Sequence, residues 1–357
     1  MAAEREHIRR SLALVLHWER GHLAAQNFIS GKSTRISAEL MPFISELSSY
    51  APRDVLTGQS SSATSIVARL IARDILVKKG SRLAAREEAL FYKWRWDIAA
   101  KYFHYTTNSV RFEARNETAL RALELKKKSD PPPSPFHELS IKYLPLPPPT
   151  SFSMSLSEAL IRRRTCRDFL PQAIDITQLS AVLAMTWGVT ATSEPGRELG
   201  AFVLKTSPSG GARHPSEVYV FASRVRGLKP GIYHYSPRLH AVCLIRRGDP
   251  SKLAKELCSR QPWVGKAAVA FFMTARVSRT MWKYEHSHAY RVLLLDAGHL
   301  GQTFHLACTA LGLGPFTTAA LNGANVEKAL DLDGIEEIVV YAAATGVPRV
   351  RKRKRPA

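Results

Sequence analysis

The chain has 357 residues, of which 45% are hydrophobic and 23% are charged, so it can form one large or two smaller globular domains. Its longest apolar stretch is interrupted by polar residues and its N-terminus lacks the apolar core of a signal peptide, which argues against a membrane span and against secretion. The net charge of +21 leaves two interpretations open: a solvated basic surface, or an anionic partner such as phosphate, nucleic acid or an acidic peptide.

The cysteines of the chain are widely spaced and form no C-x-x-C pair. We therefore expect free thiols and a cytoplasmic location, because a reducing compartment keeps such thiols unpaired.

Residues 1–125 are predicted to form a small, mostly helical, winged-helix-like domain. Helical periodicity appears in 38–47 and 63–77 and is strongest in 82–105, which also carries a run of aromatic residues. Aromatic residues at these spacings indicate a hydrophobic core, or alternatively a groove that docks a peptide or a partner protein. The proline clusters in 126–150 then predict an extended linker, because proline removes backbone donors and favours polyproline geometry.

Residues 151–348 alternate helical and strand patterns and predict an α+β layered domain. Helices are expected over 155–164, 176–187 and 284–311. Strands are expected over 218–222, 267–275 and 337–343, and in a hairpin of 231–235 with 241–245. The chain has neither a G-x-G-x-x-G following its first strand nor a P-loop, so neither dinucleotide fingerprint is supported. The tail 349–357 is basic and is expected to be disordered.

Three segments of this domain carry groups suited to chemistry. The segment 281–291 places Lys283 beside Tyr284, and both side chains can donate and accept protons beside an organic cofactor. The segment 162–169 holds several arginines, whose planar forks bind phosphate. The segment 207–215 holds Gly210 and Gly211 among small residues, which lets the backbone approach a flat or phosphorylated ligand. Each segment alone can also be a solvated helix end, a plain loop or, for Lys283, a surface ion pair with Glu285.

Together these segments resemble the nitroreductase-like flavoproteins, specifically the SagB-type dehydrogenases that act on thiazoline- and oxazoline-containing peptides. The resemblance covers 155–348, a little over half the chain. Its most specific parts are the string Ser209-Gly210-Gly211-Ala212-Arg213-His214-Pro215 and the pair Lys283-Tyr284. It implies a nitroreductase-like layered α-β-α domain, bound FMN, a homodimer, a modified precursor peptide as substrate and a heterocyclase as partner.

The resemblance also implies roles for particular residues. Lys283 and Tyr284 match the catalytic pair, and which of them takes the proton stays open. The residues expected to hold the FMN phosphate are Arg163, Arg164, Thr165 and Arg167, with Arg349 as an additional contact. The residues expected beside the flavin ring are Ser209, Gly210, Gly211 and Gly314.

Oxidation of an azoline to an azole removes one proton and one hydride, which fits a base beside a flavin. A second hypothesis is an FMN oxidoreductase that reduces nitro, quinone or similar small substrates with NAD(P)H. A third is a nucleic-acid-binding protein, which the charge suggests and which bound FMN would argue against. His286, His288 and His299 lack the carboxylates or cysteines that would complete a metal site, so no metal is expected.

Overall fold

The computed structural model describes residues 5–58, 60–108, 117–139, 142–192 and 203–349. The chain divides into two compact units, Met1–Phe112 and Glu113–Ala357. Apart from Arg349, the predicted basic tail lies outside the described residues. Within the described ranges, every helix is too short or too polar to cross a membrane.

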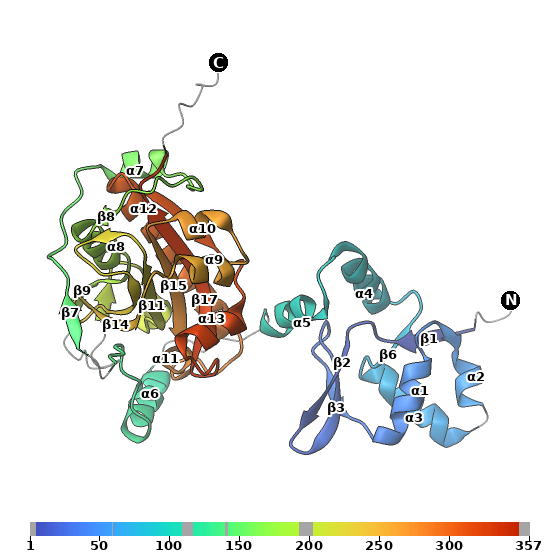
Figure 1. Ribbon diagram of the computed structural model, residues 1–357. Coiled ribbons are helices and arrows are strands. Elements are labelled where there is room, and N and C mark those ends of the chain that lie inside the picture. The colour runs from blue at the N-terminus through green and yellow to red at the C-terminus, as the bar shows by residue number, and fades with distance from the viewer. Residues whose placement is uncertain (1–4, 59, 109–116, 140–141, 193–202, 350–357) are drawn as a thin grey trace. The chain divides into compact units, whose positions relative to one another are not determined.

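The first unit combines short helices with two small antiparallel sheets, in the strand orders β5-β1-β6 and β2-β3-β4 (Figure 1). Its strands are β1 (His7–Arg10), β2 (Leu14–Glu19), β3 (His22–Asn27), β4 (Ser33–Arg35), β5 (Ala51–Pro52) and β6 (Leu76–Lys78). Its helices are η1 (Ala38–Leu40), α1 (Met41–Glu46), α2 (Arg53–Thr57), α3 (Ser61–Ala72), α4 (Arg82–Lys93) and α5 (Ile98–Thr107).

The helix predicted over 82–105 is two helices, α4 and α5. The chain extends at Trp94, and the Asp97 side chain then caps α5 by accepting a hydrogen bond from the Ala99 N–H. Asp competes with the helix backbone in this way, which the apolar periodicity alone does not reveal. Among the aromatic residues of this stretch, Tyr92 and Trp96 are 86% and 66% exposed, so they do not belong to the core.

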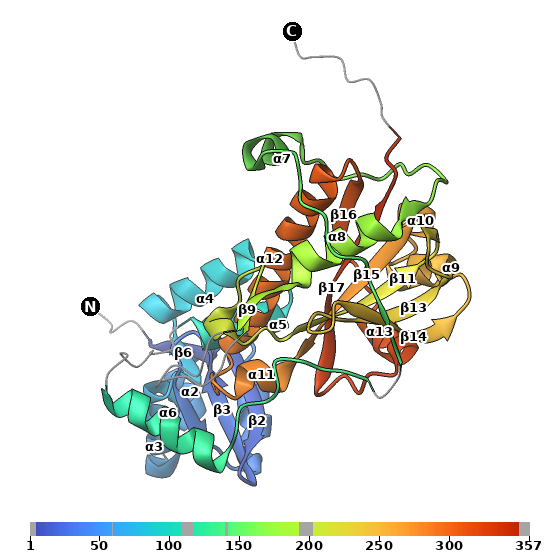
Figure 2. The ribbon, with the colours of Figure 1, turned by 90° about the vertical axis from the view of Figure 1, so that its left-hand side faces the viewer.

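The second unit begins with α6 (Glu117–Ser129) and contains a large sheet with helices on both faces (Figures 1 and 2). Its other helices are α7 (Leu156–Arg162), α8 (Ile176–Trp187), η2 (Gly210–Ala212), α9 (Ser251–Leu257), α10 (Pro262–Lys266), α11 (Val277–Met281), α12 (Ala289–Ala310) and α13 (Gly323–Leu330). Its strands are β7 (Tyr143–Pro145), β8 (Ile174–Asp175), β9 (Val189–Thr192), β10 (Val203–Lys205), β11 (Ser216–Ala222), β12 (Val225–Arg226), β13 (Gly231–Ser236), β14 (Ala241–Arg247), β15 (Val269–Arg276), β16 (Gly314–Thr318) and β17 (Glu337–Gly346).

The large sheet has the strand order β16-β17-β15-β11-β13-β14-β7, with every neighbouring pair antiparallel. Side chains of β15 alternate between its faces: Val269, Phe271 and Met273 pack with α8 and α12, whereas Ala270 and Phe272 pack with α9, α10 and α13. This alternation follows the two-residue period of a strand and separates two apolar layers. The domain is therefore the predicted layered α-β-α arrangement.

Several predicted elements of this domain are confirmed. Helix α8 has the predicted bounds, and β13 pairs with β14 as the predicted hairpin. The helix predicted over 284–311 is shorter at its start, because α12 begins only at Ala289. The Tyr284 N–H bonds back to the Thr280 carbonyl, so Lys283 and Tyr284 lie in the turn between α11 and α12.

The proline-rich segment 126–150 contains more structure than the expected linker. Its start is the end of α6, and β7 forms one edge of the large sheet. The boundary between the two units lies at 112/113, N-terminal to this segment.

Candidate functional site

A glycine-containing loop at 209–213 is fastened to helix α12 by Asp296. The Ser209 hydroxyl donates to Asp296 Oδ2 at 2.5 Å, and the Gly210 N–H donates to Asp296 Oδ1 at 3.1 Å. The same Ser209 oxygen accepts a hydrogen bond from the His214 N–H at 2.9 Å. Asp296 is only 4% exposed, and burial raises the pKa of its carboxyl. The loop position is therefore set by buried hydrogen bonds.

Lys283 and Tyr284 converge on this loop at Gly211. A Cβ atom added to Gly211 would lie 2.5 Å from Tyr284 Oη and 2.7 Å from Lys283 Nζ. Gly211 also has φ of +64°, a conformation that favours glycine. The structure thus brings together five of the predicted site residues, Ser209, Gly210, Gly211, Lys283 and Tyr284, from segments that are far apart in the sequence.

Burial keeps the Tyr284 hydroxyl protonated at neutral pH. Burial raises the pKa of Tyr284 above its ordinary value, and the nearby Arg213 guanidinium only partly opposes this shift. Arg213 donates from Nε to the Gly211 carbonyl at 3.1 Å, and burial lowers its own pKa. Tyr284 can therefore donate a hydrogen bond to a group placed against the loop.

The turn that carries Lys283 and Tyr284 is braced by the proline-rich segment. The Trp282 indole N–H donates to the Asp130 carbonyl at 2.8 Å, and Arg279 Nε donates to the Ser134 carbonyl at 2.8 Å. The Arg213 guanidinium lies over the Trp282 ring, 5.6 Å from its centroid. These contacts fix the turn to the proline-rich segment and to Arg213.

Arg279 belongs to a buried ion-pair network. Arg279 Nη1 lies 2.6 Å from Glu217 Oε1, and both side chains are at most 3% exposed. His234 Nε2 lies 3.2 Å from Glu217 Oε2. Burial alone would raise the pKa of Glu217, but the hydrogen bond with His234 and the charge of Arg279 lower it to about 2. The network is therefore charged at neutral pH and fixes β11 and α11 to each other.

The predicted phosphate-binding residues form a second group around the end of α7. Arg163 and Thr165 line a hollow of about 270 Å³ together with Gly298, Gln302 and His305 of α12. No carboxylate lines this hollow, and the buried His305 Nδ1 has no hydrogen-bond partner among the described residues. Burial and the nearby Arg163 lower the pKa of His305 to about 4, so the imidazole is neutral at neutral pH. A cation and several neutral donors without an acid are suited to a phosphate.

The remaining predicted residues of this group line an adjoining hollow of about 860 Å³. It contains Arg164, Arg167 and Arg349, and Thr165 belongs to both hollows. Gly314, which was predicted beside the flavin ring, lines this hollow as well. Arg164 donates to the carbonyls of Ile161 and Arg163, so its guanidinium also caps α7. The Arg167 guanidinium lies over the Trp263 and Phe316 rings, and Arg349 Nε lies 3.5 Å from Asp168 Oδ1. Gly314 faces Cys166, whose Sγ would lie 2.6 Å from an added Cβ.

The two groups lie on opposite sides of helix α12. Asp296 holds the glycine loop, whereas Gly298, only two residues later, lines the hollow of Arg163. Residues two apart on an α-helix project in nearly opposite directions, because each residue turns the helix by about 100°. Within one chain, the predicted catalytic pair and the predicted phosphate site therefore face away from each other.

Asp296, Arg213, Gly298 and His305 are site residues for which the sequence alone suggested no role. Asp296 and Gly298 belong to the run Asp296-Ala297-Gly298-His299 of α12. A buried acid close to an exposed glycine on one helix is a signal by which these site residues can be found. Nothing lies within 4 Å of a Cβ added to Gly298, so this part of α12 presents bare backbone that a flat ligand can approach.

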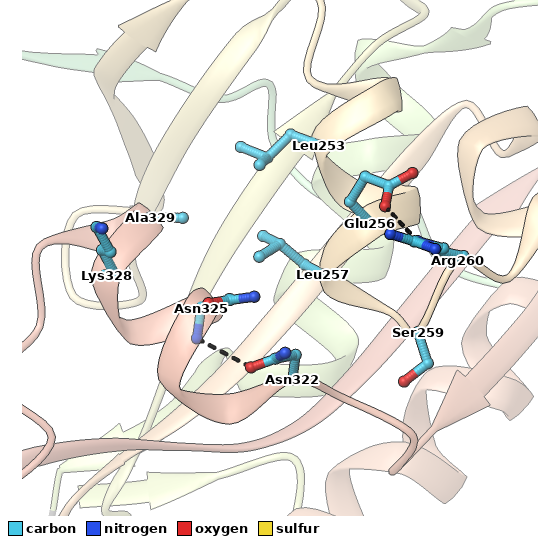
Figure 3. A pocket seen from close by; sticks show the side chains of 9 residues that line it. All are labelled: Leu253, Glu256, Leu257, Ser259, Arg260, Asn322, Asn325, Lys328 and Ala329. Carbon is cyan, nitrogen blue, oxygen red and sulfur yellow. Dashed lines mark hydrogen bonds and ion pairs between the residues drawn. The ribbon is translucent and has the colours of Figure 1, made fainter.

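A further hollow of about 660 Å³ lies between α9 and α13 and is separate from both groups (Figure 3). Its floor consists of Leu253 and Leu257, and its one acid, Glu256, is paired with Arg260 at 3.0 Å. It lies on the face of the sheet opposite α12, since α9 and α13 pack on the other apolar layer. Among the described residues, no three His, Cys, Asp or Glu side chains gather as a metal site requires.

Comparison with known proteins agrees with this fold. Residues 160–347 match the nitroreductase family, and the chain belongs to that family. It is 28% identical over 179 residues to a candidate nitroreductase, MJ1384, of Methanocaldococcus jannaschii, covering 50% of this chain and 85% of that protein. It is 35% identical over 147 residues to the trifolitoxin-processing protein TfxB of Rhizobium leguminosarum bv. trifolii, covering 40% of this chain and 39% of that protein.

Among solved structures, the fold is similar to a candidate nitroreductase from Anabaena variabilis, with a TM-score of 0.53 and 24% identity. The match covers 70% of this chain and 47% of that one, so the chain spans less than half of the Anabaena protein and of TfxB. Family membership makes the protein an FMN-dependent oxidoreductase. The residues present fit FMN, because the acid-free hollow of Arg163 suits its phosphate and the bare backbone at Gly298 suits a flat ring.

Proposed function

We propose that the protein is a SagB-type dehydrogenase that oxidises azoline rings, thiazoline or oxazoline, to azoles in a ribosomally made peptide. The observation that carries this proposal is the convergence of Lys283 Nζ and Tyr284 Oη on Gly211. A base and a hydrogen-bond donor at one point suit the removal of a proton next to a carbonyl. The similarity to TfxB, a protein named for toxin processing, supports a peptide substrate.

The chain's own residues divide the proton chemistry between them. Lys283 takes the proton from the ring carbon next to the carbonyl, and Tyr284 donates a hydrogen bond to that carbonyl oxygen. We assign the base to Lys283 because burial keeps Tyr284 protonated. Bound FMN would supply a hydride acceptor for the neighbouring ring carbon, so that the substrate would lose two electrons and two hydrogens in total. Arg213 holds the Gly211 carbonyl and so keeps the loop in place against the pair.

The FMN phosphate would be held by Arg163 and Thr165, with Arg164, Arg167 and Arg349 around the adjoining hollow. The flavin ring would lie over α12 near Gly298, and a second copy of the chain would bring Ser209, Gly210 and Gly211 to it. Support for this homodimer is that the two groups of residues face away from each other within one chain.

Exposed apolar side chains on the phosphate side of α12 also support the homodimer. Leu294 and Leu295 lie one turn before Gly298 on the same side of the helix and are 44% and 62% exposed. Ile161 on the neighbouring α7 is 73% exposed. Exposed apolar side chains of this kind are typical of an interface between subunits.

The first unit, 1–112, is proposed to dock the precursor peptide or a heterocyclase partner. Trp18, Tyr92 and Trp96 are strongly exposed there, and aromatic residues of this kind are frequent in protein interfaces.

The decisive experiment is a single turnover under anaerobic conditions. The purified protein, saturated with FMN, is mixed with a synthetic peptide that contains one thiazoline next to a carbonyl. We expect the visible absorbance of oxidised flavin to disappear, and the peptide to lose two mass units as balance requires for loss of two hydrogens. The matched control is the same peptide with the ring already a thiazole, which should leave the flavin oxidised.

The alternative function is reduction of nitro compounds or quinones with NAD(P)H, which the similarity to MJ1384 supports. In that case NAD(P)H alone should reduce the flavin rapidly, a nitroarene or quinone should reoxidise it, and the thiazoline peptide should leave it unchanged. That result would overturn the azoline dehydrogenase proposal and leave the FMN enzyme class intact.

A further inference from the structure

Another large hollow lies at the edge of the sheet that is remote from Gly314. It has a volume of about 750 Å³, within the range of ligand-binding pockets, and opens beside the edge strand β7. Its floor is apolar and consists of side chains from β7, β13, β14 and the loop before β13: Leu144, Leu228, Tyr233, Val242 and Leu244. We call it the β7 groove.

The rim of the β7 groove is strongly basic. Lys142, Lys229 and Arg247 line it and are all exposed, and none of them pairs with an acid in the described part of the chain. The one acid of the rim, Asp249, accepts hydrogen bonds from the N–H and the hydroxyl of Ser251 at the start of α9. An apolar floor under three unpaired cations is complementary to a ligand that is both acidic and apolar.

The groove is held in its shape by the fold. The Tyr233 hydroxyl donates to the Lys229 carbonyl at 2.6 Å, which fixes the loop at the rim. Gly227 in the same loop has φ of +92°, and a Cβ there would lie 3.1 Å from Ile176, so the loop packs closely on α8. Little ordering is therefore required when a ligand binds.

The position of the groove favours an extended polypeptide as the ligand. β7 pairs with β14 on one side, and its other edge pairs with no described strand. An extended chain can lie along such an edge. Pro145 lacks an N–H, so side-chain contacts rather than main-chain bonds must supply most of the recognition. The chain's own tail is basic, 351–355, and the rim would repel it.

The β7 groove is far from the turn of Lys283. The sheet order separates β7 from β15 by four strand spacings, roughly 19 Å. The loop before β13, at the rim of the groove, is aligned across the sheet with Val269 at the start of β15. The turn that carries Lys283 comes after Arg276, at the other end of β15. Those seven residues of strand add roughly 23 Å, so a chain joining the two places needs about nine extended residues.

We propose that the β7 groove is an exosite that binds an acidic, apolar segment of the substrate polypeptide, at least about nine residues from the ring that is oxidised. This inference rests on the proposed function for its substrate, whereas the binding itself can be measured without turnover. The groove would anchor the substrate and leave the reacting ring free to reach Lys283.

The binding test uses a fluorescein-labelled decapeptide of alternating glutamate and valine, titrated with the full-length protein and followed by fluorescence anisotropy. We expect the triple variant Lys142→Gln, Lys229→Gln, Arg247→Gln to bind at least about tenfold more weakly than the unmodified protein. The floor variant Leu144→Ser should also bind more weakly, and thermal denaturation should show that both variants are folded.

The matched control neutralises three exposed cations elsewhere: Lys252→Gln, Arg260→Gln, Lys328→Gln, on and beside the hollow of Figure 3. It should bind the decapeptide as the unmodified protein does, and a decapeptide with glutamine for glutamate should not bind. Equal weakening in both triple variants would mean unspecific attraction to a basic protein. That result, or undiminished binding by the groove variant, would overturn the exosite.

The turnover test compares two thiazoline peptides, one short and one extended through a ten-residue spacer by the glutamate–valine sequence. We expect the groove variant to raise the KM of the extended peptide alone, with kcat unchanged, because binding at the groove does not touch the reacting ring. Equal KM values for the extended peptide in both proteins would overturn the exosite. If neither peptide reacts, the proposed function fails, and the anisotropy result still decides the groove.

Discussion

The Asp296 carboxylate accepts the Ser209 hydroxyl at 2.5 Å, which joins helix α12 to the loop that meets Lys283 and Tyr284. The acid is buried, and its second oxygen accepts the Gly210 N–H. Two hydrogen bonds of the loop thus depend on the Asp296 side chain, and neither of them involves Lys283 or Tyr284. We therefore propose Asp296 as a positioning residue for the proposed catalytic pair.

Replacing Asp296 by alanine should lower turnover at least about tenfold, because a buried donor left without its acceptor costs about 1–3 kcal/mol and the loop can then move. The measurement is kcat with the thiazoline peptide, alongside the flavin spectrum and the melting temperature. Asp296→Asn keeps one acceptor oxygen and should lose less activity. Unchanged turnover in Asp296→Ala would show that the loop is held by other contacts.

Gly298 and Gly211 allow a test of the flavin surface. Gly298→Ala meets no atom within 4 Å, so it should raise the free energy of unfolding of the flavin-free protein by about 0.5–1 kcal/mol. The same methyl group should weaken FMN binding, measured by titration of flavin fluorescence, because it stands on the proposed flavin face. Undiminished FMN affinity would place the ring elsewhere.

The comparison variant Gly211→Ala should lower the free energy of unfolding, whereas Gly298→Ala should raise it. Its methyl group would meet Tyr284 and Lys283, and its φ of +64° is strained for alanine. We expect lower stability and lower turnover, measured by chemical denaturation and by single-turnover flavin reduction.

The roles of Lys283 and Tyr284 can be separated by pH. Lys283→Gln should abolish flavin reduction by the peptide at every pH and leave flavin bound. Tyr284→Phe should keep a residual rate, about one tenth to one hundredth, because it removes a hydrogen bond and not the base. Burial raises the pKa of Tyr284 above 10, so its deprotonation should lower the rate of the unmodified protein only above about pH 10. If Tyr284→Phe is the inactive variant, the two assignments must be exchanged.

The Glu217–His234 pair predicts how stability depends on pH. Burial alone would lower the pKa of His234, but hydrogen bonding to Cys243 and Glu217 raises it from 6.5 to about 9. Its contribution is therefore complete below pH 6.5 and is lost as the pH rises through about 9. Glu217, lowered from 4.5 to about 2, contributes fully above pH 4.5 and loses its contribution as the pH falls towards 2.

Where the Glu217–His234 pair determines the pH dependence, the melting temperature should be highest between pH 4.5 and 6.5. Glu217→Gln should flatten the decline on both sides. Glu256→Gln, at an exposed ion pair, is the control and should keep the profile of the unmodified protein. An equally steep profile in Glu217→Gln would assign the pH dependence to other groups.

The sequence predicts the elements of the second unit well where one pattern dominates. Helix α8 is apolar on most sides, and its bounds follow from Asp175 and Gly188. The start of α12 is not predictable in the same way, because Tyr284 bonds back to Thr280 and the chain turns before the helix begins. In the first unit, β4, β5 and β6 are only two or three residues long, which is too few to show a two-residue period.

For the site, the sequence likewise predicts some features and not others. The family resemblance assigned Lys283, Tyr284 and Gly211 to one site. In the structure these residues meet although 72 positions separate Gly211 from Lys283, and no local sequence pattern encodes that contact. Their separation from Arg163 was not predictable, because it depends on the contacts of Asp296 and Gly298, for which the sequence alone suggested no role.

The opposed sides of α12 have a consequence for mixtures of inactive chains. If each complete site takes the Arg163 hollow from one subunit and Lys283 from the other, a chain lacking Arg163 and a chain lacking Lys283 carry complementary defects. After unfolding and refolding together in equal amounts, half of the dimers would pair the two kinds of chain, and each such dimer would contain one intact site. The mixture should then recover about a quarter of the activity that either chain alone has lost.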